Sequence, residues 1–142
     1  VSIQHSPAYT AQEVAHSVHV SGREMAKTVI LMVDGEMTMA VLPANRKILL
    51  HELQEELRAE EVRFATEDEF RARFPDCETG AMPPFGELYG QRTFIDEMLR
   101  EEERIAFHAG DHRTAVEMYY SDFERLCQPV PADLSGPLRE RV

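Results

Sequence analysis

The chain has 142 residues, enough for one domain of ordinary size, with little room for a second. Hydrophobic residues make up 43% and charged residues 29% of the sequence, proportions that exclude a disordered or fibrous chain. With 15 Lys and Arg against 26 Asp and Glu, the net charge is −11, which disfavours bulk attraction to a phosphate backbone or an anionic membrane. Only a locally basic cleft would hold nucleic acid.

A strand and two helix starts are expected before residue 25. The strand-like pattern runs from Val1 to His5. Two capping boxes follow, at residues 10–13 and 21–24, in which a Ser or Thr side chain and a Glu three residues later satisfy each other's free backbone donors. Each box predicts that a helix begins there.

The next segment predicts a β-hairpin. Two apolar runs, over residues 27–33 and 37–42, flank Asp34-Gly35, a dipeptide that tolerates the left-handed backbone of a tight turn. The first run is apolar at consecutive positions. We therefore expect both of its faces to be covered by other parts of the protein.

A helix, a strand and a third capping box follow the hairpin. The helix is expected from Ile48 to Arg58, because leucines at positions 49, 50, 53 and 57 recur at helical spacing. The strand covers residues 62–65, and the capping box lies at residues 66–69.

The segment from Phe74 to Gly90 has neither helical nor strand periodicity, although it contains three glycines, three prolines and three aromatic residues. Long structured loops in compact domains are more often binding elements than connectors. Pro83-Pro84 fixes two backbone angles, while Gly80 and Gly86 allow sharp turns on either side. We expect a stiff loop that presents backbone N–H groups.

Three more strands and a fourth capping box complete the predicted domain. The strands are expected over residues 93–96, 105–108 and 115–119, and the box lies at residues 121–124. Interleaved strands and helices around a hairpin predict a mixed α/β (α+β) fold, in which helices pack on one mixed β-sheet within a single domain, residues 1–127. Residues 128–142 are expected to form a mobile or surface-draped C-terminal tail.

Several catalytic motifs are absent from the sequence. It has no GxSxG elbow, P-loop or GxGxxG, and neither Cys77 nor Cys127 has a His nearby in sequence, so a serine or cysteine nucleophile is not indicated. Two distant cysteines favour a reducing compartment, and no apolar stretch reaches the ~18 residues of a membrane span. We expect a cytoplasmic protein that does not enter a membrane.

The histidines do not predict a metal site. His108 and His112 are four residues apart, but Ala109-Gly110-Asp111 between them is typical of a turn, so their rings need not share a face. No HExxH or Cys/His spacing supports zinc. We predict neither a metal nor another cofactor.

Lysine is rare in this chain, and the two lysines are Lys27 and Lys47. Lys27 stands at the start of the first hairpin strand, on the same face as Val29, Leu31 and Val33. Two interpretations stay open: a strand-end lysine whose ammonium reaches water, or a cation that holds a phosphate or an ester oxygen. A buried ammonium is costly without a counterion, so an inward Lys27 requires an anionic partner, such as a substrate.

Five segments occur in an order and spacing that identify a resemblance: residues 8–15 (AYTAQEVA), 22–29 (GREMAKTV), 40–44 (AVLPA), 80–86 (GAMPPFG) and 109–113 (AGDHR). They resemble the YbaK/ProX family of free-standing domains related to the editing domain of prolyl-tRNA synthetase. The resemblance covers nearly the whole chain. It implies a YbaK-like fold and a trans-editing aminoacyl-tRNA deacylase, which hydrolyses the ester between a wrong amino acid and the 3′-terminal adenosine of a tRNA.

The resemblance also implies site residues. Lys27 matches the family's essential lysine, and Gly80 and Pro84 match the ends of its GxxxP loop, so these three are the expected catalytic residues. His108 and His112 fall where pocket positions vary between members, which leaves the amino acid open. The expected substrate-binding residues are Tyr9, Thr28, Met82, Pro83, Phe85, Gly86, His108, Gly110 and His112.

The implied chemistry requires neither a metal nor a protein nucleophile. An aminoacyl ester is already activated, and the neighbouring ribose hydroxyl helps to orient water, so the protein has only to position groups and stabilise charge. On family grounds, alanine on tRNA(Pro) is the first expected substrate and a cysteinyl-tRNA the second. The acceptor stem would be the bound part of the tRNA, and prolyl-tRNA synthetase is a further expected partner.

The net charge of −11 opposes this interpretation and keeps a second function open. The alternative is a non-catalytic module of the same fold that binds a small adenylate-like ligand or a protein partner. The oligomeric state is not predicted. Few basic residues are expected near the cleft, namely Arg23, Lys27, Arg46, Lys47, Arg92 and Arg113.

Overall fold

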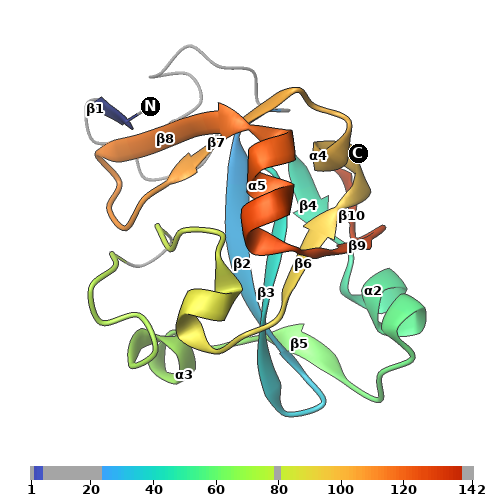
Figure 1. Cartoon of the computed structure of the whole chain (residues 1–142). Helices are drawn as coiled ribbons and strands as arrows, with labels where there is room; N and C mark the ends of the chain where they lie inside the picture. Colours follow the sequence, from blue (N-terminus) through green and yellow to red (C-terminus); the bar gives the residue numbers. More distant parts are fainter. Residues whose placement is uncertain (1, 5–23, 79–80, 139–142) are drawn as a thin grey trace.

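The computed structural model describes residues 2–4, 24–78 and 81–138 (Figure 1). Strands make up most of its secondary structure, and short helices follow several of them. In chain order the elements are β1 (Ser2–Gln4), β2 (Ala26–Val33), β3 (Glu36–Pro43), β4 (Arg46–Ile48), α2 (Leu50–Leu57), β5 (Val62–Phe64), α3 (Glu67–Arg71), the 3₁₀ helix η1 (Gly86–Tyr89), β6 (Thr93–Asp96), α4 (Glu97–Arg100), β7 (Arg104–His108), β8 (Thr114–Tyr119), α5 (Tyr120–Cys127), β9 (Val130–Ala132) and β10 (Ser135–Pro137).

The β2–β3 hairpin is the centre of a five-stranded sheet with the order β5-β2-β3-β6-β9. Asp34 and Gly35 form its turn with positive φ angles of 49° and 83°, as the sequence predicts. β5 and β3 run antiparallel to β2, whereas β6 runs parallel to β3 and β9 parallel to β6. The expected mixed sheet is therefore confirmed.

Two smaller sheets extend this framework. β1, β8 and β7 form an antiparallel sheet, and β10 pairs with β4. A parallel bridge between Met25 and Ala106 joins the start of β2 to β7, and the N–H of Ala106 donates to the carbonyl of Glu24 at 2.9 Å. The bridge brings the start of β2 beside the β7–β8 hairpin, at the top of Figure 1, whereas the β2–β3 turn lies at the bottom.

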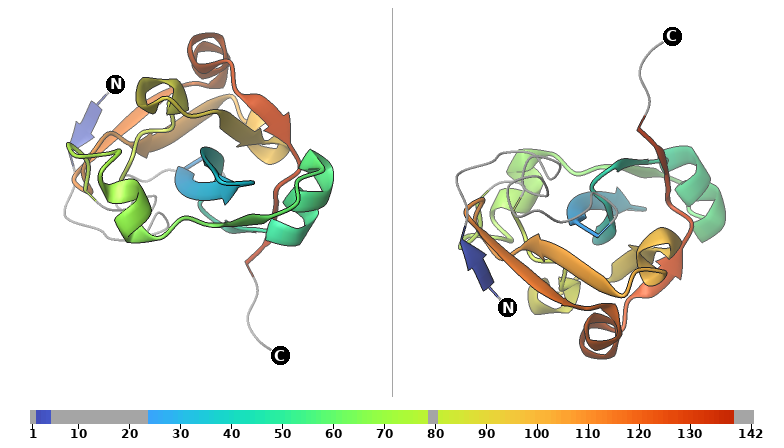
Figure 2. Two further views of the ribbon diagram at one scale, coloured as in Figure 1. Left: turned by 90° about the horizontal axis from the view of Figure 1, so that it is seen from below. Right: turned by 90° about the horizontal axis from the view of Figure 1, so that it is seen from above.

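Both faces of β2 are covered, as its apolar run predicts. Ile30 packs in a core cluster with Phe123 of α5 and Leu99 of α4, whereas the next residue, Leu31, packs in a second cluster with Leu53 of α2. We call these the α5-side and α2-side clusters. Seen along its length in Figure 2, β2 lies in the middle of the molecule, with other segments around it.

The capping boxes have different outcomes. The box at residues 66–69 is confirmed, because the Thr66 hydroxyl accepts from the N–H of Glu69 and the Glu69 carboxylate accepts from the N–H of Thr66. The box at residues 121–124 is wrong in detail, because α5 already begins at Tyr120 and Ser121 lies inside the helix. The boxes at residues 10–13 and 21–24 fall on segments that are outside the described residues, apart from Glu24.

The segment after Cys127 differs from the expected mobile or surface-draped tail. β9 adds an edge strand to the central sheet, β10 pairs with β4, and Leu134 between them is fully buried in the α2-side cluster. The prolines in this segment disfavour a strand in pattern-based prediction and so concealed β9 and β10. A proline is nevertheless compatible with an edge strand. Within the part of the chain that the structure describes, no helix is both long and apolar enough to cross a membrane.

Candidate functional site

Lys27 lies at the end of the central sheet where β2 begins, next to β7. Its Cα is paired with that of the fully buried Leu42, and the strand pleat puts its side chain on the same face as Val29 and Leu31, as predicted. The side chain is half-buried, and this burial lowers the pKa of its ammonium. Among the described residues, Lys27 has no hydrogen-bond or ion-pair partner, so its charge is available to an anion.

Thr28, the next residue, alternates to the other face of β2, where Val41 is its cross-strand neighbour. The strand pleat therefore separates Thr28 from Lys27. The substrate contact expected for Thr28 stays a prediction.

His108 is placed beside Lys27 by strand register. The parallel bridge pairs Met25 with Ala106, and Lys27 and His108 each lie two residues further along their strands. Because side chains on one face of a strand repeat every two residues, Lys27 and His108 follow the bridge on the same face. His108 is 5% exposed, so its imidazole is buried beside β2, the strand that carries Lys27.

The turn between β7 and β8 brings a second histidine to this place. Gly110 has a φ of 108°, and the rings of His108 and His112 lie edge to face with centroids 5.1 Å apart. A ring nitrogen of His108, Nδ1, lies 3.2 Å from the carbonyl of Asp111. The expected turn is confirmed, and its geometry makes the two rings neighbours. No group of three His, Cys, Asp or Glu side chains suited to a metal occurs in the described ranges.

The long loop is tied to the same turn by two backbone hydrogen bonds. The N–H of Glu78 donates to Gly110 at 2.8 Å, and the N–H of Gly110 donates to Ala81 at 2.9 Å. Gly80 itself lies outside the described residues, as does Tyr9, but the residues on both sides of the 79–80 gap are held against Gly110. The loop end is thus tied to the histidine turn, whose strand β7 is joined to the start of β2 by the Met25–Ala106 bridge.

The remaining loop residues fasten the loop to the core. Met82 is 4% exposed, and the Phe85 ring packs against Phe107 and Phe123, all in the α5-side cluster. The structure therefore buries Met82, and packs the partly buried Phe85, on the side of β2 opposite Lys27. Their expected role in substrate binding stays a prediction.

Pro84 and Gly86 also fasten the loop to the rest of the fold. The Pro84 carbonyl accepts a long hydrogen bond of 3.6 Å from the Cys127 thiol, and the N–H of Gly86 donates to the Thr93 hydroxyl at 2.8 Å. A Cβ at position 86 would meet that hydroxyl and lie 2.8 Å from the Gln91 carbonyl, so only glycine fits there. Pro83 is half-buried between these anchors. The catalytic role expected for Pro84 stays a prediction.

Glu78 is a site residue that sequence reasoning missed. Its carboxylate accepts a 2.7 Å hydrogen bond from the N–H of His112 and so fixes the histidine turn against the loop. No spacing rule finds this contact, because 34 residues separate the two partners. Within the turn, a hydrogen bond from the N–H of Arg113 lowers the pKa of Asp111, and the charge of His108 adds to this effect.

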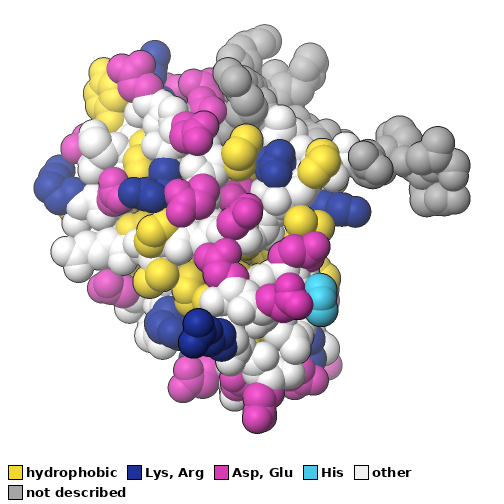
Figure 3. Space-filling model, turned by 90° about the vertical axis from the view of Figure 1, so that its right-hand side faces the viewer, with side chains coloured by type: hydrophobic (Ala, Val, Ile, Leu, Met, Phe, Trp, Pro, Cys, Tyr) yellow, Lys and Arg dark blue, Asp and Glu magenta, His cyan; other side chains and the backbone are white. Residues whose placement is uncertain are grey.

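The basic residues expected near the cleft do not all gather there. Arg113 belongs to the histidine turn, but Arg46 is held by the hydroxyl and carbonyl of Ser135, and Arg92 stacks on the ring of Phe94 at 5.2 Å. The face drawn in Figure 3 carries Asp and Glu side chains interspersed with separate Lys and Arg side chains, without a continuous basic area among the described residues of that face.

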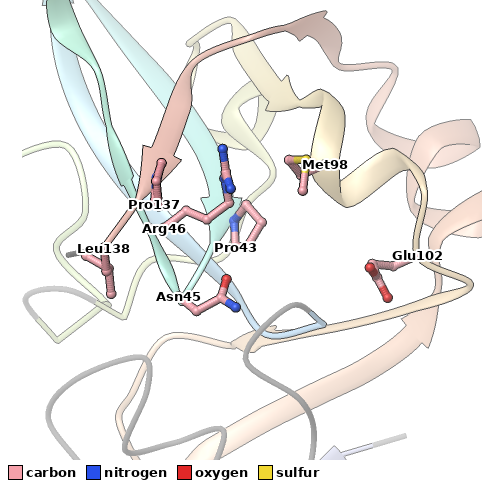
Figure 4. A pocket seen from close by; sticks show the side chains of 7 residues that line it. All are labelled: Pro43, Asn45, Arg46, Met98, Glu102, Pro137 and Leu138. Atoms are coloured by element: carbon pink, nitrogen blue, oxygen red, sulfur yellow. The ribbon is translucent and has the colours of Figure 1, made fainter.

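Arg46 lines a pocket of about 240 Å³ between the β3–β4 turn, α4 and β10 (Figure 4). Its walls include Pro43, Met98 and Pro137, and Glu102 lies across the pocket from Asn45. The Arg46 guanidinium is already engaged by Ser135 and lies 4.0 Å from the Asp96 carboxylate. This arginine therefore supports the fold of the C-terminal strands.

The chain is similar to one protein family and to several solved structures. The model of one protein family, the aminoacyl-tRNA editing domain, matches residues 5–126. No curated protein sequence matches the chain.

Three solved structures have the same fold. A proposed trans-editing enzyme for prolyl tRNA synthetase is 18% identical with a TM-score of 0.84, over 95% of this chain and 85% of that one. A hypothetical protein is 21% identical with a TM-score of 0.85, over 96% and 91% of the two chains. A proposed signal transduction protein from Marinobacter aquaeolei VT8 is 20% identical with a TM-score of 0.72, over 94% of this chain but 27% of that one.

Proposed function

The chain belongs to the aminoacyl-tRNA editing domain family, and from this premise we propose that it is a free-standing, trans-editing deacylase. The reaction is hydrolysis of the ester between a small, wrongly attached amino acid and the 3′ end of a tRNA. The observation that carries the proposal is Lys27, a half-buried ammonium with no partner among the described residues, which follows the Met25–Ala106 bridge on the same face as His108. Such a cation is suited to the anionic end of a tRNA.

In the proposed mechanism the protein positions groups and supplies charge. Lys27 neutralises the terminal phosphate or the negative charge that develops on the ester oxygen, and backbone groups of the loop from Gly80 to Pro84 hold the carbonyl and the attacking water. The ester is already activated, and the neighbouring ribose hydroxyl orients the water. We propose that the reaction needs neither a metal nor a covalent enzyme intermediate.

Selectivity is proposed to come from the size of a substrate pocket formed beside the histidine turn. His108 is ordered by burial and His112 packs against its ring, so their imidazoles are suited to form a wall that excludes larger side chains. Exclusion by size is effective, whereas one missing methylene gives only about a 10–200-fold preference. We propose alanine as the first substrate and cysteine as the second, on tRNA(Pro).

The proposed partners follow from this substrate. The acceptor stem of the tRNA is the bound part, and a solved structure of the same fold is a proposed trans-editing enzyme for prolyl tRNA synthetase, which supports that synthetase as a second partner. Because the substrate belongs to translation, we propose a cytoplasmic location.

Lys27→Ala tests the mechanism, and Lys47→Ala is the matched control, because Lys47 is the other lysine and lies exposed on β4. Loss of one charge stabiliser typically reduces kcat by about 10²–10³, so we expect that loss for Lys27→Ala and wild-type rates for Lys47→Ala. Deacylation is measured on alanyl-, cysteinyl- and prolyl-tRNA(Pro), and folding by circular dichroism. Wild-type hydrolysis by a folded Lys27→Ala variant would contradict the mechanism.

The second function is a non-catalytic module that binds an adenylate-like ligand or a protein partner. The observation that favours it is the net charge of −11, with acidic side chains across the face in Figure 3. A panel of misacylated tRNAs separates the two functions, since the non-catalytic module hydrolyses none of them.

A further inference from the structure

Glu78 is joined to the histidine turn, residues 109–113 between β7 and β8, by its backbone and by its side chain. Its N–H donates to the carbonyl of Gly110 at 2.8 Å, and its carboxylate accepts from the N–H of His112 at 2.7 Å. Its carbonyl accepts from the N–H of Ala81 at 3.0 Å, and the carbonyl of Ala81 accepts from the N–H of Gly110 at 2.9 Å. One residue therefore connects the end of the long loop to the turn.

Only one of these contacts depends on the side chain at position 78. Every residue except proline supplies a backbone N–H, and every residue supplies a carbonyl. The bond to His112 instead requires an acceptor at the reach of a glutamate side chain. Glu78 is exposed, so its carboxylate keeps this hydrogen bond although water is available to it. The side chain thus adds a restraint on the turn that the backbone alone does not provide, and hydrogen bonds to a charged acceptor are among the stronger ones.

The position of the histidine turn is set partly from outside the turn. Gly110 has a φ of 108°, a conformation that glycine adopts readily, and both its N–H and its carbonyl bond to the loop. Within the turn, the carboxylate of Asp111 accepts from the N–H of Arg113 at 2.9 Å and orders the residues after His112. The residues before His112 are therefore held by the loop, and Glu78 contributes the side-chain part of that support.

The contact from Glu78 acts directly on the residue that carries the second imidazole. The donor is the N–H of His112 itself, and the His112 ring packs edge to face against the ring of His108, with centroids 5.1 Å apart. His108 is buried, and its Nδ1 lies 3.2 Å from the carbonyl of Asp111. The ring of His112 is thus held between an anchored backbone and a buried partner. Supporting contacts of this kind decide how precisely a functional side chain is placed.

We propose that Glu78 is a positioning residue that determines specificity: it holds His112 where the two imidazoles exclude amino acids larger than the substrate. This inference rests on the proposed function, because it deepens the selectivity assigned there to the histidine turn. Glu78 acts only through His112. A wall that excludes by size must not yield, and a displacement of about 1 Å changes enzymatic rates by up to about 10²-fold. Without the carboxylate the wall yields, and a larger side chain enters.

Three substitutions separate the reach of the side chain from its charge. Glu78→Gln keeps a carbonyl oxygen at the same reach and removes the charge, whereas Glu78→Asp keeps the charge and is shorter by one methylene. Glu78→Ala removes both. Because the proposal assigns the role to the hydrogen bond with His112, Glu78→Gln should resemble the wild type and Glu78→Asp should resemble Glu78→Ala.

Steady-state kcat/KM for prolyl-tRNA(Pro), divided by that for alanyl-tRNA(Pro), measures the discrimination by size. We expect Glu78→Ala and Glu78→Asp to raise this ratio at least about tenfold, and Glu78→Gln to stay within about twofold of the wild type. The rise comes from faster hydrolysis of the prolyl ester. A merely structural loss would slow the hydrolysis of both esters and would not change the ratio in this direction.

Glu87→Ala is the matched control, because Glu87 is an exposed carboxylate on η1 of the same loop. It removes the same charge, which affects the approach of both tRNAs equally, so the ratio should not change. Hydrogen exchange at the His112 amide, followed by NMR, gives a readout that is independent of hydrolysis. The amide should lose protection in Glu78→Ala and Glu78→Asp, and keep it in Glu78→Gln and Glu87→Ala.

The inference is overturned if an active Glu78→Ala variant keeps the wild-type ratio, or if Glu87→Ala raises the ratio as much. It is also overturned if Glu78→Asp keeps the ratio while Glu78→Gln loses it, since the charge and not the hydrogen bond would then act. If the wild type hydrolyses none of the alanyl, cysteinyl and prolyl esters, the proposed function fails and the inference fails with it. An unchanged ratio in an active enzyme contradicts the inference alone.

Discussion

Lys27 illustrates how a single residue is given its function by its neighbours. The sequence places Lys27 at the start of an apolar strand, a position from which its side chain could extend either into water or into a pocket. The tertiary structure half-buries the side chain, which lowers the pKa of the ammonium, and the Met25–Ala106 bridge puts His108 on the same face. Burial favours the neutral amine, so an anionic ligand at Lys27 restores the charged form.

Asp96 is a second buried charge, two strands across the central sheet from Lys27. It is 0% exposed, and its carboxylate accepts hydrogen bonds from the Ser135 hydroxyl and from the N–H of Met98. Burial nevertheless raises its pKa, although these hydrogen bonds and the charge of Arg46 act in the opposite direction. Asp96 joins the central sheet to β10 at the cost of keeping a carboxyl group out of water.

Asp96→Asn makes this cost measurable as a dependence of stability on pH. The raised pKa means that the folded protein keeps a proton that the unfolded chain releases above its ordinary pKa of about 3.8, so the contribution of Asp96 to stability falls as the pH rises through the folded pKa. We expect the free energy of unfolding of the wild type, minus that of Asp96→Asn, to decrease between pH 4 and pH 7. Urea denaturation at both pH values measures it, and a difference that grows with pH would contradict the assignment.

At the scale of elements, local patterns predicted most strands and the hairpin. Asp34-Gly35 gives its turn by local backbone preference, and β6 and β7 fall where short apolar runs predict them. The elements that pattern reasoning missed are short ones such as α4, β4, β9 and β10, where few residues carry the periodicity. The strands β4, β9 and β10 are held by partners distant in sequence, so no local signal predicts them.

Leu134→Ala tests whether the C-terminal strands belong to the folded core. Leu134 is fully buried in the α2-side cluster, and truncation of such a leucine costs about 2–5 kcal/mol of unfolding free energy. Leu138→Ala in the same segment is the control, because Leu138 is 46% exposed and its truncation should change stability by no more than about 0.5 kcal/mol. Chemical denaturation measures both, and equal effects would show that the segment is only loosely attached.

At the scale of the whole molecule, acidity limits how tRNA is bound. The charge of −11 and the absence of a continuous basic area on the face in Figure 3 leave few cations for phosphate contacts among the described residues. Arg46 is already used by Ser135, and Arg92 lies at the hairpin end of the sheet. We therefore expect binding through the 3′ end and a small number of charge contacts.

The dependence of KM on salt tests this expectation. With about two phosphate contacts, raising the salt from about 50 to about 200 mM should weaken apparent tRNA affinity only about 10–20-fold, whereas proteins with 6–10 contacts lose about 10³–10⁵. Deacylation kinetics at both salt concentrations measure the change. A loss of about a thousandfold would reveal an extensive basic interface and contradict the limited-contact proposal.

By itself, the sequence determined the mixed fold, the central hairpin, the family resemblance and the position of Lys27 on its strand, because these depend on local backbone preference, on alternation and on short motifs. Only the tertiary structure decided that β9 and β10 complete the sheets, that Glu78 holds the histidine turn, and that Met82 and Phe85 pack in the core. It also brought Gly35, Arg73 and Gly90 together around one pocket. These contacts join residues far apart along the chain, and their partners are chosen by packing and strand register, which no local pattern encodes.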